Sequence, residues 1–179
     1  HSDPRCVILN KPAGLATQGG SGIGSRHVEA MLPGLGRGRY WLVHRLDKEV
    51  SGTLAIARDV GAATTLGEHF RRRRVEKTYW ALVKGAAPAR SGTIALDIEG
   101  KPSETEYRVV QDLGGFGAWL ALRPLTGRKH QLRIHCAEGL KCPIVGETRY
   151  GPDAELRGMP PIGPPMHGIA DLASGGLHL

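Results

Sequence analysis

The chain has 179 residues and a mass of 19.2 kDa, enough to bury one sizeable hydrophobic core, and this length favours one domain over two. Hydrophobic residues make up 40% and charged residues 23% of the chain, a balance that excludes a disordered or fibrous protein. Its 24 Lys and Arg against 17 Asp and Glu give a net charge of +7, which fits a polyanionic partner and fits a solvated basic surface equally well.

Hydrophobic periodicity and turn residues predict a mixture of short helices and strands. In chain order, we expect a strand at residues 7–9, a helix at 25–32, strands at 40–46 and 53–57, a helix at 60–70, strands at 78–83, 93–98, 104–110 and 118–122, and a helix at 129–140. Ser25 is the expected N-cap of the first helix. The closely spaced later strands favour antiparallel or mixed meanders, and the Gly- and Pro-rich tail from Pro152 onward is expected to be largely loop.

The segment His44-Arg45-Leu46-Asp47 places one carboxylate among basic side chains. Nearby positive charge keeps a carboxylate ionised, as a nucleophile or a general base requires. From the residues alone, however, an aspartate here is more often an N-cap or a turn residue. The helix at 60–70 is followed by four consecutive arginines at residues 71–74, and such a run is usually a solvated face.

Two later segments combine basic side chains with an aromatic or apolar residue. Tyr79 lies in a predicted strand between Lys77 and Lys84, where its ring can stack on a base or simply fill the core. Residues 126–135 carry five cationic or potentially cationic side chains, which suit either a phosphate-binding wall or a basic solvated helix.

Together with two flanking segments, these stretches resemble the signature motifs of RluA-like RNA pseudouridine synthases. The five matching segments, in order, are residues 10–15, 44–52, 77–85, 126–135 and 143–146 leading to Tyr150-Gly151. An ordered set of this kind, spanning residues 7–151, is far more specific than any one motif.

The resemblance implies an α+β fold with a central mixed, mostly antiparallel sheet, flanked by helices and cut by a basic RNA-binding cleft with Asp47 on its wall. We expect residues 1–179 to form a single catalytic domain that is truncated at both ends. The chain begins without Met, and it stops at Leu177-His178-Leu179, which looks like the start of the family's closing motif.

The same resemblance implies isomerisation of uridine to pseudouridine in RNA, with Asp47 as the catalytic carboxylate. Asp47 would attack ribose C1′ or abstract a neighbouring ribose proton. Arg133 would pair with Asp47 and hold it charged, because a guanidinium can contact a carboxylate through two hydrogen bonds. Tyr79 would stack on the target uracil.

Further residues are expected to bind the RNA. Arg45 would enter the gap that the extruded nucleotide leaves, while Lys77, Arg128, Lys129 and His130 would line the path of the phosphates. Structured RNA is the expected partner, ribosomal RNA first, with transfer or messenger RNA as alternatives and a pre-ribosomal particle as a further partner. No cofactor, metal or membrane is implied.

Two other functions fit parts of the sequence. The fold could serve mainly as an RNA-binding ribosome-assembly factor, although the presence of Asp47, Tyr79 and Arg133 argues against a dead enzyme. A zinc hydrolase could use His44, Asp47, His130 and His135, but the last two are five residues apart and would not share a helix face well.

Cysteine usage and one further resemblance bear on location. Three cysteines are too few and too oddly numbered for a disulfide framework, so we expect a reducing compartment. No run approaches the roughly eighteen apolar residues of a membrane span. Residues 129–143 resemble eukaryotic organellar members of the family, which implies the mitochondrial matrix, with the cytoplasm as the alternative.

Overall fold

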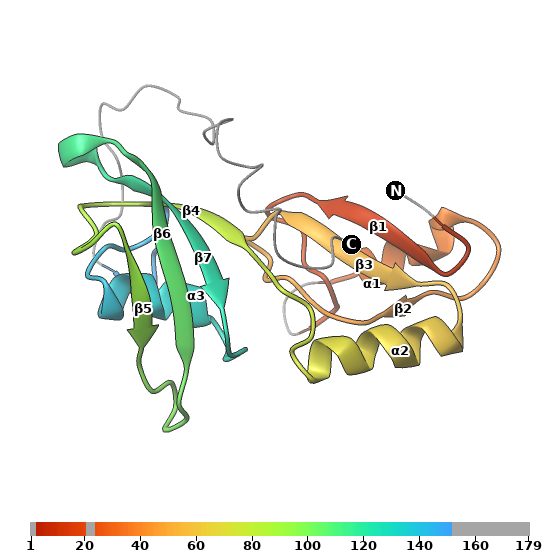
Figure 1. Ribbon diagram of the computed structural model, residues 1–179. Helices are drawn as coiled ribbons and strands as arrows, with labels where there is room; N and C mark the ends of the chain where they lie inside the picture. Colours follow the sequence, from red (N-terminus) through yellow and green to blue (C-terminus); the bar gives the residue numbers. More distant parts are fainter. Residues whose placement is uncertain (1–2, 21–23, 152–179) are drawn as a thin grey trace. The chain divides into compact units, whose positions relative to one another are not determined.

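The computed structural model describes residues 3–20 and 24–151 (Figure 1). The chain divides into two compact units, His1–Val75 and Glu76–Leu179, hereafter unit 1 and unit 2. In the described ranges, no helix has the length and apolar character needed to cross a bilayer.

Unit 1 is built on a three-stranded antiparallel sheet with the order β1-β3-β2. The strands are β1 (Cys6–Lys11), β2 (Trp41–Leu42) and β3 (Gly52–Ala57). β3 lies in the centre and buries four successive residues, from Leu54 to Ala57, which explains its continuous apolar sequence.

Three helical segments accompany this sheet: α1 (Val28–Met31), the 3₁₀-helix η1 (Leu32–Leu35) and α2 (Val60–Arg71). Asp59 caps α2 by accepting a hydrogen bond from the Ala62 amide at 2.8 Å. The prediction that Ser25 caps the first helix was wrong. His27 is the N-cap, since its Nδ1 accepts from the Ala30 amide at 3.3 Å.

Unit 2 is built on a four-stranded antiparallel sheet with the order β4-β7-β6-β5. The strands are β4 (Tyr79–Val83), β5 (Ser91–Ala95), β6 (Glu104–Asp112) and β7 (Ala118–Pro124), and the 3₁₀-helix η2 (Gly114–Phe116) joins the last two. Val83, Leu120 and Leu122 are fully buried in a core that also contains Cys136 and Cys142. This core therefore joins the sheet to the helical segment that follows β7.

That helical segment begins as α3 (Gln131–Ile134) and continues as one π-helical turn, η3 (His135–Gly139). Its buried side carries His135 and Cys136, and Arg133 is partly exposed. π-helical turns inside helices frequently occur at functional sites.

The predicted α+β fold with mostly antiparallel strands is confirmed. The strands form two sheets, however, where we expected one central mixed sheet, and every named strand pair in the described ranges is antiparallel. Periodicity shows which face of a strand is buried but not which edges pair, so it could not separate one sheet from two. The predicted loop from Pro152 onward lies outside the described residues, and the single truncated domain stays a prediction.

Candidate active site

Asp47 lies half-buried at the start of the turn that connects β2 and β3. The Val50 amide donates to the Asp47 carbonyl at 3.1 Å and closes this turn. The buried Thr17 hydroxyl donates to the Leu46 carbonyl at 2.7 Å and accepts from the Leu46 amide at 3.1 Å. Both backbone groups of the residue before Asp47 are thus fixed by one side chain from a distant loop, which limits the positions that the carboxylate can take.

Lys11 also binds this turn, through its side-chain ammonium. Its ammonium is almost fully buried and donates to the carbonyls of Pro12 at 2.9 Å, Leu15 at 2.8 Å and Lys48 at 3.4 Å. Burial lowers the pKa of Lys11, and the negative charges of Glu49 and Asp47 oppose that shift. A buried cation therefore holds two loops together next to the candidate catalytic carboxylate.

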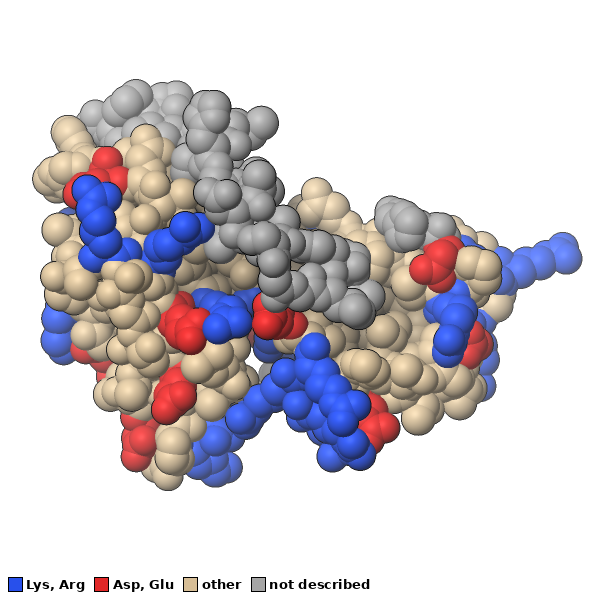
Figure 2. Space-filling model, in the orientation of Figure 1, with Lys and Arg blue, Asp and Glu red and all other residues tan. Residues whose placement is uncertain are grey.

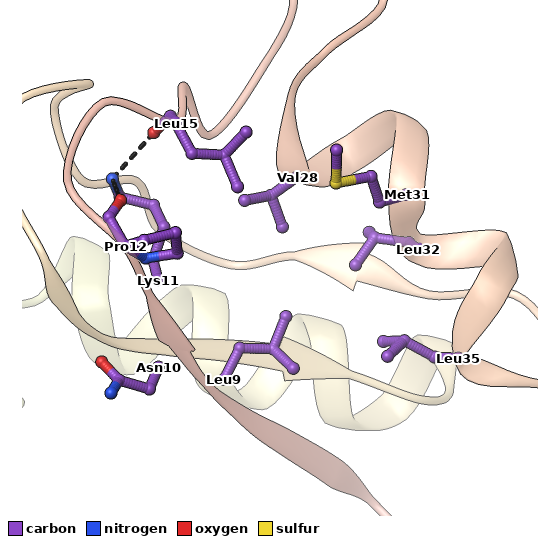
Figure 3. A pocket seen from close by; sticks show the side chains of 9 residues that line it. All are labelled: Leu9, Asn10, Lys11, Pro12, Leu15, Val28, Met31, Leu32 and Leu35. Carbon is purple, nitrogen blue, oxygen red and sulfur yellow. Dashed lines mark hydrogen bonds between the residues drawn. The ribbon is translucent and has the colours of Figure 1, made fainter.

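The Lys11 side chain also lines a small groove of about 180 Å³ between β1 and the segment α1–η1 (Figure 3). The figure shows its ammonium reaching the Leu15 carbonyl, while apolar side chains surround the rest of the groove. Lys11 is the one charged residue among those lining the groove, and its ammonium is engaged by the loop carbonyls. We therefore assign this groove no catalytic role.

His44, three residues before Asp47, has a structural role. Its Nε2 accepts a hydrogen bond from the Ala55 amide at 2.9 Å, and its ring stacks on Phe70 of α2 with ring centroids 4.2 Å apart. The segment that carries Arg45 and Asp47 is thereby attached to both β3 and the last turn of α2. Arg45 itself is exposed.

In unit 2, Tyr79 and the segment 126–133 lie at the same end of the four-stranded sheet. Tyr79 is the first residue of β4 and pairs with Leu122 near the end of β7. Because β4 and β7 are antiparallel, the start of one lies beside the end of the other. Lys77, which precedes β4, and Arg128, which follows β7, belong to this end of the sheet too.

The buried Gln131 fixes the segment that follows β7. Its amide nitrogen donates to the Glu104 carbonyl at 2.8 Å and to the Thr105 hydroxyl at 3.0 Å. Its amide oxygen accepts from the Arg128 amide at 2.9 Å and lies 2.7 Å from the Thr126 hydroxyl. Every polar group of this side chain is used, so the turn that carries the basic residues is rigidly built.

Arg133 forms a bidentate ion pair with Glu147 inside unit 2. Its Nε and Nη2 donate to the two carboxylate oxygens of Glu147 at 2.5 and 2.8 Å. The side chain of Glu147 is 2% exposed and that of Arg133 is 20% exposed. The hydrogen bonds from Arg133 are the largest cause that lowers the pKa of Glu147 to about 2. The guanidinium is therefore held in one plane by a carboxylate that stays ionised at neutral pH.

Tyr150 completes this network. The guanidinium carbons of Arg133 and Arg149 each lie 5.3 Å from the centroid of its ring. Its hydroxyl lies 2.7 Å from Nδ1 of His130, a residue in the left-handed conformation with φ of 55°. His130, Arg133, Glu147 and Tyr150 thus form one connected group of side chains at the segment after β7.

The predicted site residues fall into two groups. Arg45 and Asp47 belong to unit 1, while Lys77, Tyr79, Arg128, Lys129, His130 and Arg133 belong to unit 2. The predicted pairing of Asp47 with Arg133 joins the two units and stays a prediction. The Arg128 guanidinium donates twice to the Pro102 carbonyl, each at 3.2 Å, and Lys129 is exposed.

Sequence reasoning missed four residues that hold these groups in place: Lys11, Thr17, Gln131 and Glu147. The clearest overlooked signal was Glu147, the one acidic residue among residues 141–151, a stretch that belongs to the fifth motif. The contacts of Thr17 with Leu46 bridge 29 residues of sequence, and no local pattern indicates them.

In the alternative zinc arrangement, His44 and His135 each use one ring nitrogen in an internal contact. His44 accepts from the Ala55 amide, and Nε2 of the buried His135 lies 2.7 Å from the Ser103 hydroxyl. In residues 3–20 and 24–151, no group of three or more His, Cys, Asp and Glu side chains is arranged to hold a metal ion.

Comparison with known proteins connects these motifs to a family. A family model described as RNA pseudouridylate synthase matches residues 5–138. "RNA pseudouridine synthase 4, mitochondrial" of Arabidopsis thaliana is 39% identical over 84% of this chain and 40% of its own length. "Ribosomal large subunit pseudouridine synthase C" of Rickettsia bellii is 38% identical over 86% of this chain and 56% of its own length. The chain thus spans about half the length of these relatives.

A solved structure agrees with the sequence matches. The structure titled "Human RNA Pseudouridylate Synthase Domain Containing 4" superposes with a TM-score of 0.69 at 32% identity, covering 84% of this chain and 67% of the human one. The matched residues 5–138 include Asp47, Tyr79 and Arg133. The chain therefore belongs to the RNA pseudouridylate synthase family, within its RluA-like group.

Proposed function

We propose that this protein isomerises uridine to pseudouridine in structured RNA and that Asp47 is its catalytic carboxylate. The observation that carries the proposal is the position of Asp47. It is a half-buried carboxylate on a turn whose backbone is fixed by Thr17 and Lys11, inside the segment that matches the family model. Such fixation suits a group that must meet one ribose carbon in one geometry.

The reaction breaks the bond between uracil N1 and ribose C1′ and forms a bond between uracil C5 and C1′. A proton leaves C5 and a proton is gained at N1, so atoms and electrons balance within one nucleotide. Asp47 would act in its ionised form, either by attacking C1′ or by removing a neighbouring ribose proton. The two routes make the same demand on the protein, which is a charged and oriented carboxylate.

Arg133 and Tyr79 would complete the catalytic group. Glu147 engages Nε and Nη2 of Arg133 and so holds the plane of the guanidinium in one orientation. We assign Arg133 the role of pairing with the Asp47 carboxylate. The partly exposed ring of Tyr79, at the edge of the unit 2 sheet, would stack on the uracil while it is turned over.

Ribosomal RNA is the proposed substrate class, in keeping with the name of the Rickettsia relative. The exposed Arg45 would fill the gap left by the extruded nucleotide, and Lys77, Arg128, Lys129 and His130 would contact phosphates.

The mitochondrial matrix is the proposed location, in keeping with the Arabidopsis relative. A full-length protein without an Arg-rich, acid-poor amphipathic leader would contradict that location.

The proposal predicts that Asp47→Asn lowers the rate of pseudouridine formation by on the order of 10² to 10⁴-fold, because the amide cannot act as a nucleophile or a base. RNA affinity should change little. Purified wild-type and variant proteins would be incubated with transcribed ribosomal RNA, and pseudouridine measured by mass spectrometry of the digested RNA.

Asp112→Asn is a suitable control, because Asp112 is an exposed carboxylate at the end of β6. Equal pseudouridine yields from the wild type and Asp47→Asn would contradict the assignment of Asp47. RNA binding without any pseudouridine formation by the wild type would instead favour the RNA-binding assembly factor.

A further inference from the structure

We infer that the four arginines at the C-terminal end of α2, Arg71 to Arg74, form a phosphate-binding surface that positions the RNA beside the target nucleotide. This inference rests on the proposed function and extends it to residues outside the motifs. In Figure 2, basic side chains gather and project at the C-terminal end of α2, with a small acidic area beside them.

The charge of this surface, here called the arginine turn, is largely uncompensated. Glu68 is its acidic neighbour and contacts both Arg71 at 3.2 Å and Arg72 at 2.5 Å. Within the described part of the chain, Arg73 and Arg74 form no ion pair, and both are exposed. One carboxylate therefore faces four guanidinium groups, an excess of positive charge that a polyanion would neutralise.

The end of α2 is closed by backbone groups of these residues and not by their side chains. The turn is closed by backbone hydrogen bonds from Arg73 to Phe70 at 3.1 Å and from Arg74 to His69 at 2.9 Å. Arg73 has a φ of 56°, the left-handed conformation that usually belongs to glycine at the end of a helix. A glycine would close this turn with less strain, whereas the arginine places an exposed guanidinium at the apex.

The contact between His44 and Phe70 relates the arginine turn to Asp47 within unit 1. The stacked rings lie 4.2 Å apart, Phe70 is three residues before Arg73, and His44 is three residues before Asp47. Three residues span at most roughly 11 Å of chain. The arginine turn and Asp47 therefore lie in the same unit, on a helix end and a loop that pack together through these two rings.

Arginine fits an RNA backbone well, because its planar guanidinium can donate two parallel hydrogen bonds to one phosphate. Such contacts carry no sequence information but fix the register of the bound strand. The arginine turn would therefore determine how the RNA lies across unit 1, while other residues select the uridine.

The test compares Arg73→Gln/Arg74→Gln with the control Arg5→Gln/Arg37→Gln, which removes two exposed arginines elsewhere in unit 1. Binding of a fluorescein-labelled RNA stem-loop would be measured by anisotropy over a series of salt concentrations. Loss of two phosphate contacts should reduce the slope of log affinity against log salt by about 1.4, and weaken binding roughly 25-fold at 0.1 M salt. Arg73→Lys/Arg74→Lys should keep most of the slope, because it keeps both charges.

Pseudouridine formation by the wild type on transcribed ribosomal RNA would be measured in parallel. An active wild type whose Arg73→Gln/Arg74→Gln variant binds RNA like the control would overturn the arginine turn and leave the proposed function standing. A wild type that forms no pseudouridine, with binding lost in this variant, would sink the proposed function but support the surface.

Discussion

Glu147 and Arg133 show how single residues prepare this site. A guanidinium held by a buried carboxylate cannot rotate freely, so it can meet a second carboxylate without reordering. The carboxylate is also shared with the backbone, because the amides of Arg149 and Tyr150 donate to its Oε1 at 2.7 and 3.3 Å. The ion pair therefore supports the fold of the last described turn as well as the role proposed for Arg133.

Glu147→Gln should make the stability of the protein less dependent on acid pH. The pKa of Glu147 is lowered from 4.5 to about 2 in the folded state. The stability that ionised Glu147 contributes to the folded protein is therefore fully present above pH 4.5 and is lost as the pH falls through about 2. A difference of this size corresponds to about 3 kcal/mol at pH 7. Urea unfolding at pH 7, 4.5 and 3 would measure the gap between variant and wild type, which should narrow toward low pH.

Glu138→Gln is the matched control for that series, since Glu138 is an exposed carboxylate in the same helical segment. Its unfolding free energy should follow that of the wild type at each pH. A constant gap between Glu147→Gln and the wild type from pH 7 to 3 would count against an ionised Glu147.

The sequence named candidate reactive side chains but not the residues that hold them in place. Asp47, Tyr79 and Arg133 were chosen because they lie in the motifs that resemble the family, and their roles stay predictions. Thr17 and Lys11 were missed, because a hydroxyl or an ammonium that binds distant backbone groups leaves no periodic signal in the chain. Arg133 was expected to need a carboxylate partner, but its partner Glu147 was not foreseen.

At the scale of elements, the turn between β2 and β3 depends on contacts from two other segments. Thr17 fixes Leu46 and Lys11 binds the Lys48 carbonyl, so the two sides of Asp47 are held independently. The element boundaries predicted by apolar runs were nearly right for α2 and β4. β2 is much shorter than predicted, and the backbone of Leu46, in the predicted part that is not strand, binds the Thr17 side chain.

Thr17→Val should destabilise unit 1 by about 2 kcal/mol, because it leaves a buried amide and a buried carbonyl of Leu46 without their partner. Thr17→Ser keeps the hydroxyl and should retain most of the stability. Chemical denaturation of both variants, with hydrogen exchange at the Leu46 amide, would measure the effect. Equal losses in the two variants would show that the methyl group, not the hydroxyl, matters.

At the scale of the molecule, the single domain expected from the sequence stays a prediction, and the structure has two compact units, each with its own sheet. Length and composition determine how much apolar surface the chain can bury, but not how that surface is divided between separate cores. The predictions of an α+β fold and of the family are confirmed because ordered motifs run through both units.

The buried cysteines of unit 2 can be used to measure whether the core of that unit is closed to solvent. Burial raises the pKa of Cys136 to about 12 and also raises that of Cys142. The pKa of Cys6 in unit 1 is raised as well, by burial and by its hydrogen bond to Asp3, but Cys6 is partly exposed and so can be reached by a reagent. In native protein at pH 8, iodoacetamide should alkylate Cys6 at least about 100-fold faster than Cys136. Mass spectrometry of tryptic peptides would give the rates, and equal rates would contradict a closed core.

We propose that Asp47 makes this family member an active enzyme on cellular RNA. This proposal is tested by site-resolved pseudouridine mapping of ribosomal and transfer RNA in cells that carry the intact protein or its Asp47→Ala variant. We predict the loss of one or a few ribosomal RNA sites in the variant, with the variant protein still present. An unchanged map at normal protein levels would contradict the claim.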